Sequence, residues 1–219
     1  MYSDRQNVPL VDSFCSQSPI IPVVAIESSS DAISLARALI DGGINVIEVT
    51  LRTNAALAAM EQIAKHVPQM QLAAGTVLNP EQYQQAIDAG ATFVISPGIT
   101  NSLLEKGQDN DVPLLPGVST ASELMQAIEY GYSRCKFFPA EAAGSIAMLK
   151  ALSGPFGQVK FCPTGGITTD NAEKFLALNN VMCVGGSWLS PQQLIEQKNW
   201  QAITDIARDS ISKVSANIK

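Results

Sequence analysis

The sequence predicts an α/β protein, a (β/α)8 TIM barrel with an additional N-terminal helix, and three observations favour this fold class. Short apolar runs rich in β-branched residues alternate with longer amphipathic stretches along the chain. Eight such runs are present, each followed by a helical pattern, and eight strands close a barrel. A length of 219 residues is also usual for a barrel that forms one domain. We therefore expect residues 1–219 to fold as a single domain.

The expected strands are the apolar runs Ile20–Ile26, Asn45–Thr50, Gln71–Val77, Phe93–Ser96, Leu114–Val118, Cys135–Phe138, Val159–Thr164 and Val181–Val184. Amphipathic patterns between them predict helices such as Asp31–Asp41, Ala55–His66, Pro80–Asp88, Ala121–Tyr130 and Asp170–Ala177. Polar residues that can cap helices precede these segments, and glycines follow at Gly42, Gly90 and Gly131. A segment near Arg5–Ser16 is expected to form an extra helix across the bottom of the barrel, and Trp200–Val214 the last helix.

Composition and charge exclude several classes of protein. Hydrophobic residues make up 46% of the chain and charged residues 16%, which suffices for a large core and is atypical of a disordered chain. The net charge is −6 and no basic run is present, so neither nucleic acid nor an anionic membrane is an expected partner. The N-terminal residues are polar and no apolar run approaches about 18 residues, so we expect a soluble, cytoplasmic protein.

The residue types that usually bind metals are few and scattered. The four cysteines, Cys15, Cys135, Cys162 and Cys183, occur singly, and His66 is the one histidine of the chain. Because these residues lack the spacing of a zinc site, we expect neither a metal nor a cofactor. The cysteines are expected to be buried and reduced.

Lys136 lies inside the short apolar run Arg134–Pro139. Burial disfavours the charged ammonium, so we expect this amine to be partly neutral near neutral pH and able to form a Schiff base with a ketone. The alternative is a structural lysine whose stem packs on the neighbouring phenylalanines while its amine reaches water. A rival amine, Lys160, opens its strand and is expected at the bottom of the barrel, away from the strand ends that carry catalytic groups in this fold.

Glu48 and Arg52 come at the end of the second strand. Alternation along Val46–Thr50 places Glu48 on the face that points into the barrel, where a carboxylate must be paired or protonated. Glu48 is therefore a candidate general acid or base, or else half of a structural ion pair with Arg52. The planar guanidinium of Arg52 can grip a carboxylate or phosphate, or it can be a solvated loop arginine.

Two glycine pairs follow the last two strands, in Thr164-Gly165-Gly166 and in Gly185-Gly186-Ser187. The loops after strands seven and eight are the common phosphate site of TIM barrels, because bare backbone amides can approach an anion there. A single glycine pair is more often explained by a left-handed turn. Two pairs on consecutive strand ends favour an anion site, to which Ser187 can add a hydroxyl.

Several segments resemble the 2-keto-3-deoxy-6-phosphogluconate (KDPG) and 4-hydroxy-2-oxoglutarate (KHG) aldolases. They follow one another in order between Pro19 and Trp188, and they are Gly43–Thr53, Ala74–Leu78, Ile95–Gly98, Lys136–Glu141, Phe161–Ile167 and Gly185–Trp188. The resemblance implies a metal-free, homotrimeric class I aldolase of the Entner–Doudoroff pathway. Such an enzyme cleaves 2-dehydro-3-deoxy-6-phosphogluconate to pyruvate and glyceraldehyde 3-phosphate, and its relatives also act on 4-hydroxy-2-oxoglutarate.

The resemblance also implies roles for individual residues. Lys136 corresponds to the Schiff-base lysine and Glu48 to the residue that shuttles protons. The keto-acid end is expected to bind in a pocket formed by Arg52, Thr76, Pro97, Phe138 and Thr164. The phosphate is expected to bind to Gly165, Gly166, Gly185 and Ser187.

One segment departs from what a phosphate site would favour. The loop after the first strand, Glu27–Ser30, is acidic and hydroxylic, so no cation from it can assist phosphate binding. The preference between phosphorylated and unphosphorylated substrates therefore stays open, as does the choice of the C4-epimeric galactonate substrate. Two further readings of the residues are an isomerase or epimerase of sugar phosphates and a non-catalytic barrel that senses an anionic metabolite.

Overall fold

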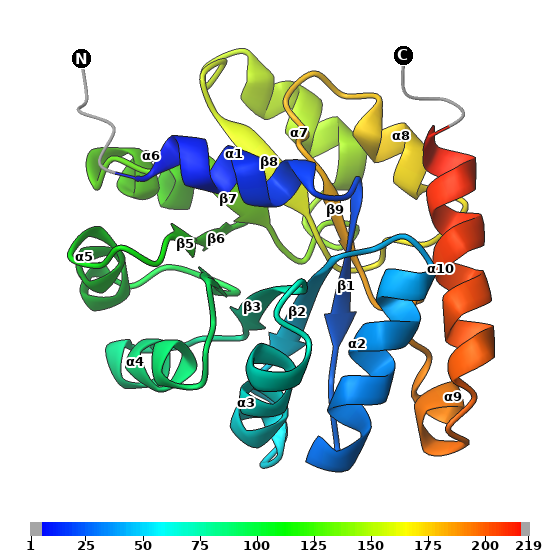
Figure 1. The fold of residues 1–219 in the computed structure, drawn as a ribbon. Helices are drawn as coiled ribbons and strands as arrows, with labels where there is room; N and C mark the ends of the chain where they lie inside the picture. The colour runs from blue at the N-terminus through cyan, green and yellow to red at the C-terminus, as the bar shows by residue number, and fades with distance from the viewer. Residues whose placement is uncertain (1–5, 216–219) are drawn as a thin grey trace.

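The computed structural model describes residues 6–215 and shows an α/β fold in which parallel strands curl around a core and helices pack outside them (Figure 1). Six strands form one sheet in the order β5-β4-β3-β2-β1-β9. Their bounds are β1 Ile20–Val24, β2 Val46–Thr50, β3 Gln71–Gly75, β4 Phe93–Ile95, β5 Leu114–Leu115 and β9 Val184–Gly186. A second sheet has three strands, which are β6 Gly117–Val118, β7 Arg134–Phe137 and β8 Lys160–Pro163.

Helices α2 to α8 lie between successive strands, as the alternating sequence pattern predicted, whereas α1 precedes β1 and α9 and α10 follow β9. Their bounds are α1 Val8–Ser16, α2 Ala32–Asp41, α3 Ala56–His66, α4 Pro80–Asp88, α5 Asn101–Gln108, α6 Ala121–Glu129, α7 Ser145–Ser153, α8 Ala172–Leu176, α9 Gln192–Glu196 and α10 Trp200–Ser215. Asn79 caps α4 as expected, and Thr120 forms a capping box with Glu123 at the start of α6. None of the helices in residues 6–215 is long and apolar enough to cross a bilayer.

The predicted fold needs correction where the eight expected strands were counted as continuous. The run Leu114–Val118 is divided at Pro116 into β5 and β6, and these two pieces belong to different sheets. Proline has no N–H to donate to a neighbouring strand, although the carbonyl of Pro116 still accepts from Lys136 N at 2.8 Å. The run Val181–Val184 is also shifted, because the strand begins only at Val184. Between β8 and β9 the pairing is reduced to two isolated parallel bridges, Phe161 with Val181 and Thr164 with Gly185.

The N-terminal helix α1 covers the end of the sheet at which the strands begin (Figure 1). Phe14 stacks on Phe93, the first residue of β4, with ring centroids 4.0 Å apart. The guanidinium of Arg134, the first residue of β7, donates to both carboxylate oxygens of Asp12 at 2.7 and 2.9 Å. The predicted covering helix is thus confirmed, although it begins at Val8, and Arg5 lies outside the described residues.

Gln6, just before α1, joins β5 to β7 through its side-chain amide. The amide nitrogen donates to the carbonyls of Leu114 (2.9 Å) and Arg134 (3.0 Å), and the amide oxygen accepts from the backbone N–H groups of Ser133 and Arg134 at 3.2 and 2.8 Å. These bonds satisfy strand backbone at the edge where the two sheets meet, which would otherwise be left without partners. Gln6 therefore links the two sheets here, where no regular strand pair joins them.

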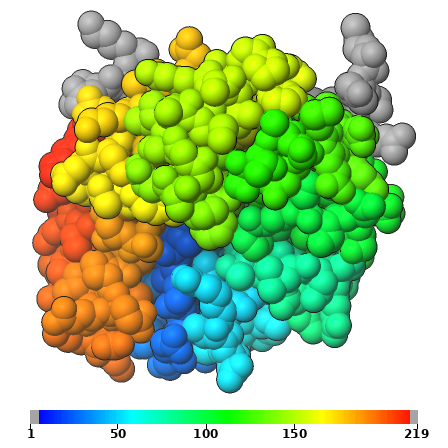
Figure 2. All heavy atoms as spheres, turned by 180° about the vertical axis from the view of Figure 1, so that it is seen from behind, coloured from blue at the N-terminus to red at the C-terminus, as the bar shows by residue number. Residues whose placement is uncertain are grey.

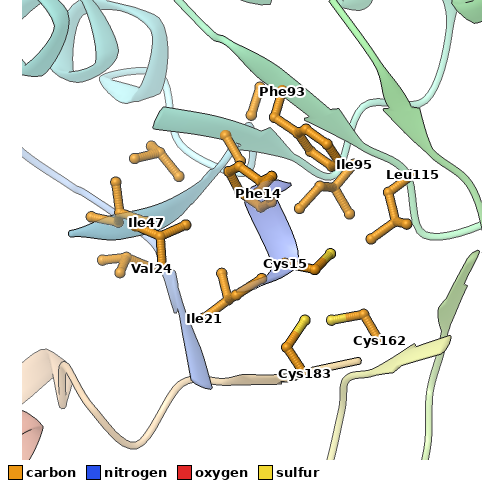
Figure 3. Packing of buried hydrophobic residues seen from close by; sticks show 14 of the residues in the cluster. Phe14, Cys15, Ile21, Val24, Ile47, Phe93, Ile95, Leu115, Cys162 and Cys183 are labelled. Carbon is orange, nitrogen blue, oxygen red and sulfur yellow. The ribbon is translucent and has the colours of Figure 1, made fainter. Parts of the chain in front are cut away.

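The four cysteines are buried and free, as the sequence predicted. Cys15 from α1, Cys162 from β8 and Cys183, just before β9, face one another in the core (Figure 3). Hydrogen bonding with Cys15 and Cys162, together with burial, raises the pKa of Cys183 well above its ordinary value. Burial raises the pKa of Cys135 to about 12, against the lowering effect of the charge on Arg134. These thiols act as small apolar side chains of the core.

Candidate active site

All eleven residues that the sequence predicted for the site line one cavity of about 330 Å³. The cavity lies at the carboxyl ends of the strands, and the face seen in Figure 2 is recessed between the segments that follow β1 (blue), β2 (cyan) and β9 (orange). The structure thus brings together Glu48, Arg52, Thr76, Pro97, Lys136, Phe138, Thr164, Gly165, Gly166, Gly185 and Ser187. Val23, Thr50, Ile167 and Gly186 complete the lining.

The central feature of the cavity is a buried ion pair between β2 and β7. Lys136 Nζ donates to Glu48 Oε1 at 2.9 Å, and the two side chains are 6% and 3% exposed. The same amine lies 5.5 Å from the centre of the Phe138 ring. The lysine does not reach bulk water, and Glu48 pairs with Lys136 rather than with Arg52. The alternative of a lysine whose amine reaches water is therefore wrong, and so is Arg52 as the ion-pair partner of Glu48.

Gly75 makes room for the Glu48 carboxylate. It ends β3 opposite Thr50 of β2, and a Cβ at this position would overlap the carboxylate of Glu48 and come within 2.6 Å of its Cγ. The next residue, Thr76, has a φ of 59°, in the left-handed region that a β-branched residue rarely adopts. Such strain is characteristic of functional sites, and it occurs here where Thr76 lines the cavity.

Arg52 stands at the rim of the cavity on the loop after β2. Its Nε–H donates to Thr50 Oγ1 at 3.1 Å, and the Thr50 hydroxyl donates to the carbonyl of Val24 at 2.9 Å. The sequence reasoning did not assign Thr50 to the site, although strand alternation places it on the same face as Glu48. With Lys136 and Glu48, Arg52 completes the charged groups among the residues that line the cavity.

The glycine loops place free backbone donors on the cavity wall. Gly165 and Gly166 have φ values of 99° and 77°, so the chain reverses there in a conformation that suits glycine. Among the described residues, no group accepts a hydrogen bond from the backbone N–H of Gly165, Gly166 or Ser187. Successive free N–H groups in such a turn form an anion-binding concavity. The left-handed turn and the predicted anion site thus coincide.

A different contact explains why residue 185 is a glycine. A Cβ at this position would overlap the side chain of Thr164, which lies opposite it across the bridge from β8. At Gly186 a Cβ would overlap the indole of Trp188, whose Nε1–H donates to Ser210 in α10 at 3.1 Å. The second glycine pair therefore lets polar and aromatic side chains pack closely behind the cavity wall, which no sequence pattern indicated.

The rival amine Lys160 lies where the sequence predicted. It is the first residue of β8, and its Nζ donates to the carbonyl of Asn179 at 2.5 Å. It does not line the cavity that holds Lys136. In the described part of the chain, no cluster of three or more His, Cys, Asp and Glu side chains is placed to hold a metal ion.

The chain is similar to known proteins over most of its length. A family model described as "KDPG and KHG aldolase" matches residues 11–206. The KHG/KDPG aldolase of Escherichia coli (strain K12) is 47% identical over 200 residues, which cover 91% of this chain and 94% of that protein. The 2-dehydro-3-deoxy-phosphogluconate aldolase of Pseudomonas aeruginosa is 42% identical over 213 residues, 97% of each chain.

Two solved structures resemble the whole chain. The KDPG aldolase of Legionella pneumophila, with pyruvate captured as a covalent carbinolamine intermediate, has a TM-score of 0.90 and 50% identity, covering 91% of this chain and 97% of its own. The aldolase of Zymomonas mobilis ZM4 with 3-phosphoglycerate has a TM-score of 0.86 and 43% identity, covering 92% and 95%. By its sequence and its fold, the chain belongs to the KDPG and KHG aldolase family.

Proposed function

We propose that this chain is a class I aldolase that cleaves 2-dehydro-3-deoxy-6-phosphogluconate to pyruvate and glyceraldehyde 3-phosphate. The observation that carries the proposal is the amine of Lys136, buried in a cavity and 2.9 Å from an equally buried carboxylate. The covalent pyruvate intermediate of the Legionella relative supports the same chemistry. An isomerase or epimerase on this barrel would use the carboxylate and the anion site but leaves the amine without a role.

In the proposed mechanism, Lys136 and Glu48 act as one unit. Glu48 accepts a proton from the ammonium of Lys136, and the freed amine attacks the C2 ketone to form a carbinolamine. Loss of water, for which Glu48 returns a proton to the leaving hydroxyl, gives a protonated imine. Their separation of 2.9 Å places each group within reach of the other for these transfers.

The imine then serves as the electron sink for cleavage. Glu48 takes the proton of the C4 hydroxyl, the C3–C4 bond breaks, and its electron pair moves onto C3 to give an enamine while C4 becomes the aldehyde. Protonation of C3 and hydrolysis of the imine release pyruvate and regenerate Lys136. Positioned proton transfer of this kind contributes about 10²–10⁴-fold to the rate.

The substrate is proposed to lie across the cavity between Arg52 and the glycine loops. Arg52, Thr76 and Thr164 bind the keto-acid end, and Pro97 and Phe138 form the walls. Gly165, Gly166, Gly185 and Ser187 hold the phosphate, which the free N–H groups of three of them support. Since no lining residue near these loops is cationic, backbone amides carry most of this binding, and unphosphorylated 4-hydroxy-2-oxoglutarate is a proposed second substrate.

We further propose that the two sheets form one closed (β/α)8 barrel, and that the protein acts as a cytoplasmic homotrimer in the Entner–Doudoroff pathway. The two bridges between β8 and β9 and the Gln6 link between β5 and β7 support closure. The trimer, the compartment and the pathway rest on the family resemblance. The molar mass in solution tests the trimer, since a monomer would weigh about one third of the expected value.

Trapping of the imine tests the proposed function. Borohydride added together with pyruvate is expected to leave a stable secondary-amine adduct, which peptide mass spectrometry locates on Lys136. Lys160→Arg is the matched control and should be labelled like the wild type, whereas Lys136→Arg should remain unlabelled. An unlabelled wild-type protein, or an adduct on another lysine, would refute the assignment.

A further inference from the structure

The guanidinium of Arg52 is held by a single hydrogen bond in the structure. Its Nε–H donates to Thr50 Oγ1 at 3.1 Å, and in residues 6–215 no other group bonds to it. Arg52 is an exposed residue on a loop, and a long charged side chain in that setting has many rotamers to choose from. The contact with Thr50 therefore determines which way the planar fork faces.

The position of Thr50 allows it to fix the orientation of the Arg52 guanidinium. It is the last residue of β2, it is 2% exposed, and its hydroxyl donates to the carbonyl of Val24 at the end of β1. A hydroxyl has one hydrogen, and Val24 receives it, so Thr50 can only accept from Arg52. The bond to Nε thus has a fixed polarity and comes from a rigid strand end.

The hydrogen bond to Thr50 limits how Arg52 can bind an anion. A guanidinium has five N–H donors, and with the Nε–H used by Thr50 the remaining four are on Nη1 and Nη2. A carboxylate can then be gripped through two parallel bonds at the Nη1–Nη2 edge, but not at the edge that contains Nε. Thr50 accordingly selects one of the two binding edges of Arg52.

We propose that Thr50 is a positioning residue that orients Arg52, so that the Nη1–Nη2 edge of the guanidinium receives the carboxylate of the keto acid. This inference rests on the proposed function, because it takes Arg52 as the group that binds that carboxylate. In this role Thr50 acts on the bound carboxylate through Arg52.

The chain offers a matched control in Thr53. Its hydroxyl donates to the carbonyl of Ile26 at 2.6 Å, so it anchors the same loop to the segment after β1. The hydroxyl of Thr53 makes no hydrogen bond to the neighbouring Arg52, and Thr53 does not line the cavity. Thr50→Val and Thr53→Val each remove a hydroxyl that donates to a carbonyl at or just after the end of β1, but only the first removes the acceptor of the Arg52 Nε–H.

The experiment compares pyruvate with its uncharged amide, pyruvamide, in borohydride trapping of wild type, Thr50→Val, Thr50→Ser and Thr53→Val. Half-saturation by pyruvate is expected to rise about tenfold in Thr50→Val, the effect of weakening one hydrogen bond to a charged group. Half-saturation by pyruvamide should stay near the wild-type value, since the amide has no carboxylate to bind. Thr50→Ser keeps the hydroxyl and should restore the wild-type response to pyruvate, and Thr53→Val should resemble wild type with both ligands.

Two results would overturn the inference. Equal shifts in Thr50→Val and Thr53→Val would mean that Thr50 only anchors the loop, and equal shifts for both ligands in Thr50→Val would mean that the carboxylate is not involved. Failure of the wild type to be trapped by pyruvate at any concentration is a different result. It would remove the proposed function, and the inference with it.

Discussion

Strand β7 carries a cation–carboxylate pair at each of its ends, and the two pairs differ in burial and in geometry. At the amino end, Arg134 grips Asp12 through two hydrogen bonds, and the side chains are 16% and 45% exposed. Two residues further along, Lys136 makes one bond to Glu48 and both side chains are nearly inaccessible. The first pair is a two-point clamp that holds α1 against the strands. The second is a single contact in a cavity, which leaves the amine free to exchange its partner for a substrate.

The surroundings of the two pairs differ in the same way. At the amino end, Phe14, Gln6 and the cysteines pack beneath α1, and the cavity beside Phe14 and Phe93 is lined by no cationic side chain. The carboxyl end is hollow, and glycines such as Gly75 keep it so by leaving space for polar side chains. The amino ends of the strands therefore stabilise the fold. The carboxyl ends hold charged groups whose burial costs free energy, as is usual for the catalytic end of this fold.

Of the substitutions that test this comparison, Lys136→Met should have the largest effect on turnover and on stability. Turnover should be abolished, because no other amine lines the cavity to form the imine. Removing one partner of a buried pair also leaves Glu48 uncompensated, which should reduce the free energy of unfolding by about 3–5 kcal/mol. Asp12→Asn at the partly exposed pair should lose only about 1 kcal/mol or less and keep its activity. Urea unfolding and steady-state rates measure both, and equal losses of stability in the two variants would contradict the distinction.

Gly75→Ala tests whether the space beside Glu48 matters as much as Glu48 itself. The added methyl group would displace the carboxylate from Lys136, and a shift of about 1 Å at a catalytic group can reduce the rate about 10²-fold. Gly98→Ala is the control, since a Cβ there meets nothing within 4 Å. Rates of aldol cleavage compare the two, and a fully active Gly75→Ala variant would show that the carboxylate position is not critical.

Gln6→Leu should affect stability at the amino ends of the strands and leave the active-site cavity unchanged. The substitution leaves four backbone groups of β5 and β7 without their amide partner, and an unsatisfied buried group costs about 1–3 kcal/mol. We expect a lower midpoint of urea unfolding with the kcat of aldol cleavage unchanged. A variant as stable as wild type would mean that the link between the two sheets is dispensable.

The smallest effect is expected at Glu123 in the capping box of α6. Burial acts to raise the pKa of Glu123, but hydrogen bonds from Ser119 and Thr120 outweigh it, so the pKa is lowered. A carboxylate with a lowered pKa stabilises the fold above the pKa of its unfolded form, and this contribution is lost as the pH falls through the folded pKa. Glu123→Gln should therefore be less stable than wild type by about 0.5–1 kcal/mol at neutral pH. The difference should shrink below about pH 4 in pH-dependent unfolding, and a constant difference would contradict the account.

The sequence predicted the alternation of strands and helices because that alternation depends on local patterns. The pocket roles of Thr76, Pro97 and Phe138, in contrast, followed from the family resemblance. Period-2 alternation was enough to turn Glu48 inward, and the position of Lys136 near a strand end was enough to place it at the site. No bounds were predicted for helix α5, since Leu103 and Leu104 are its only buried residues and leave little helical periodicity to detect.

The features that the sequence did not indicate depend on contacts between distant segments. Gln6 bonds to residues that lie 108 and 128 positions away along the chain, and nothing near Gln6 in the sequence indicates those partners. The partner of Glu48 was ambiguous for the same reason, because Lys136 is 88 residues away and Arg52 only four. The spaces left by Gly75 and Gly185 are defined by neighbouring strands. Pairing across the sheet, which is a tertiary property, decides each of these cases.

A crystal structure of the protein soaked with pyruvate at low pH tests the central claim most directly, because it shows which atom the ligand joins. The account predicts electron density continuous from Lys136 Nζ to C2 of pyruvate, with Glu48 within hydrogen-bond distance of the new bond and the carboxylate on Arg52. Pyruvate bound without a covalent bond to Lys136, or joined to Lys160 at the other end of the strands, would contradict it.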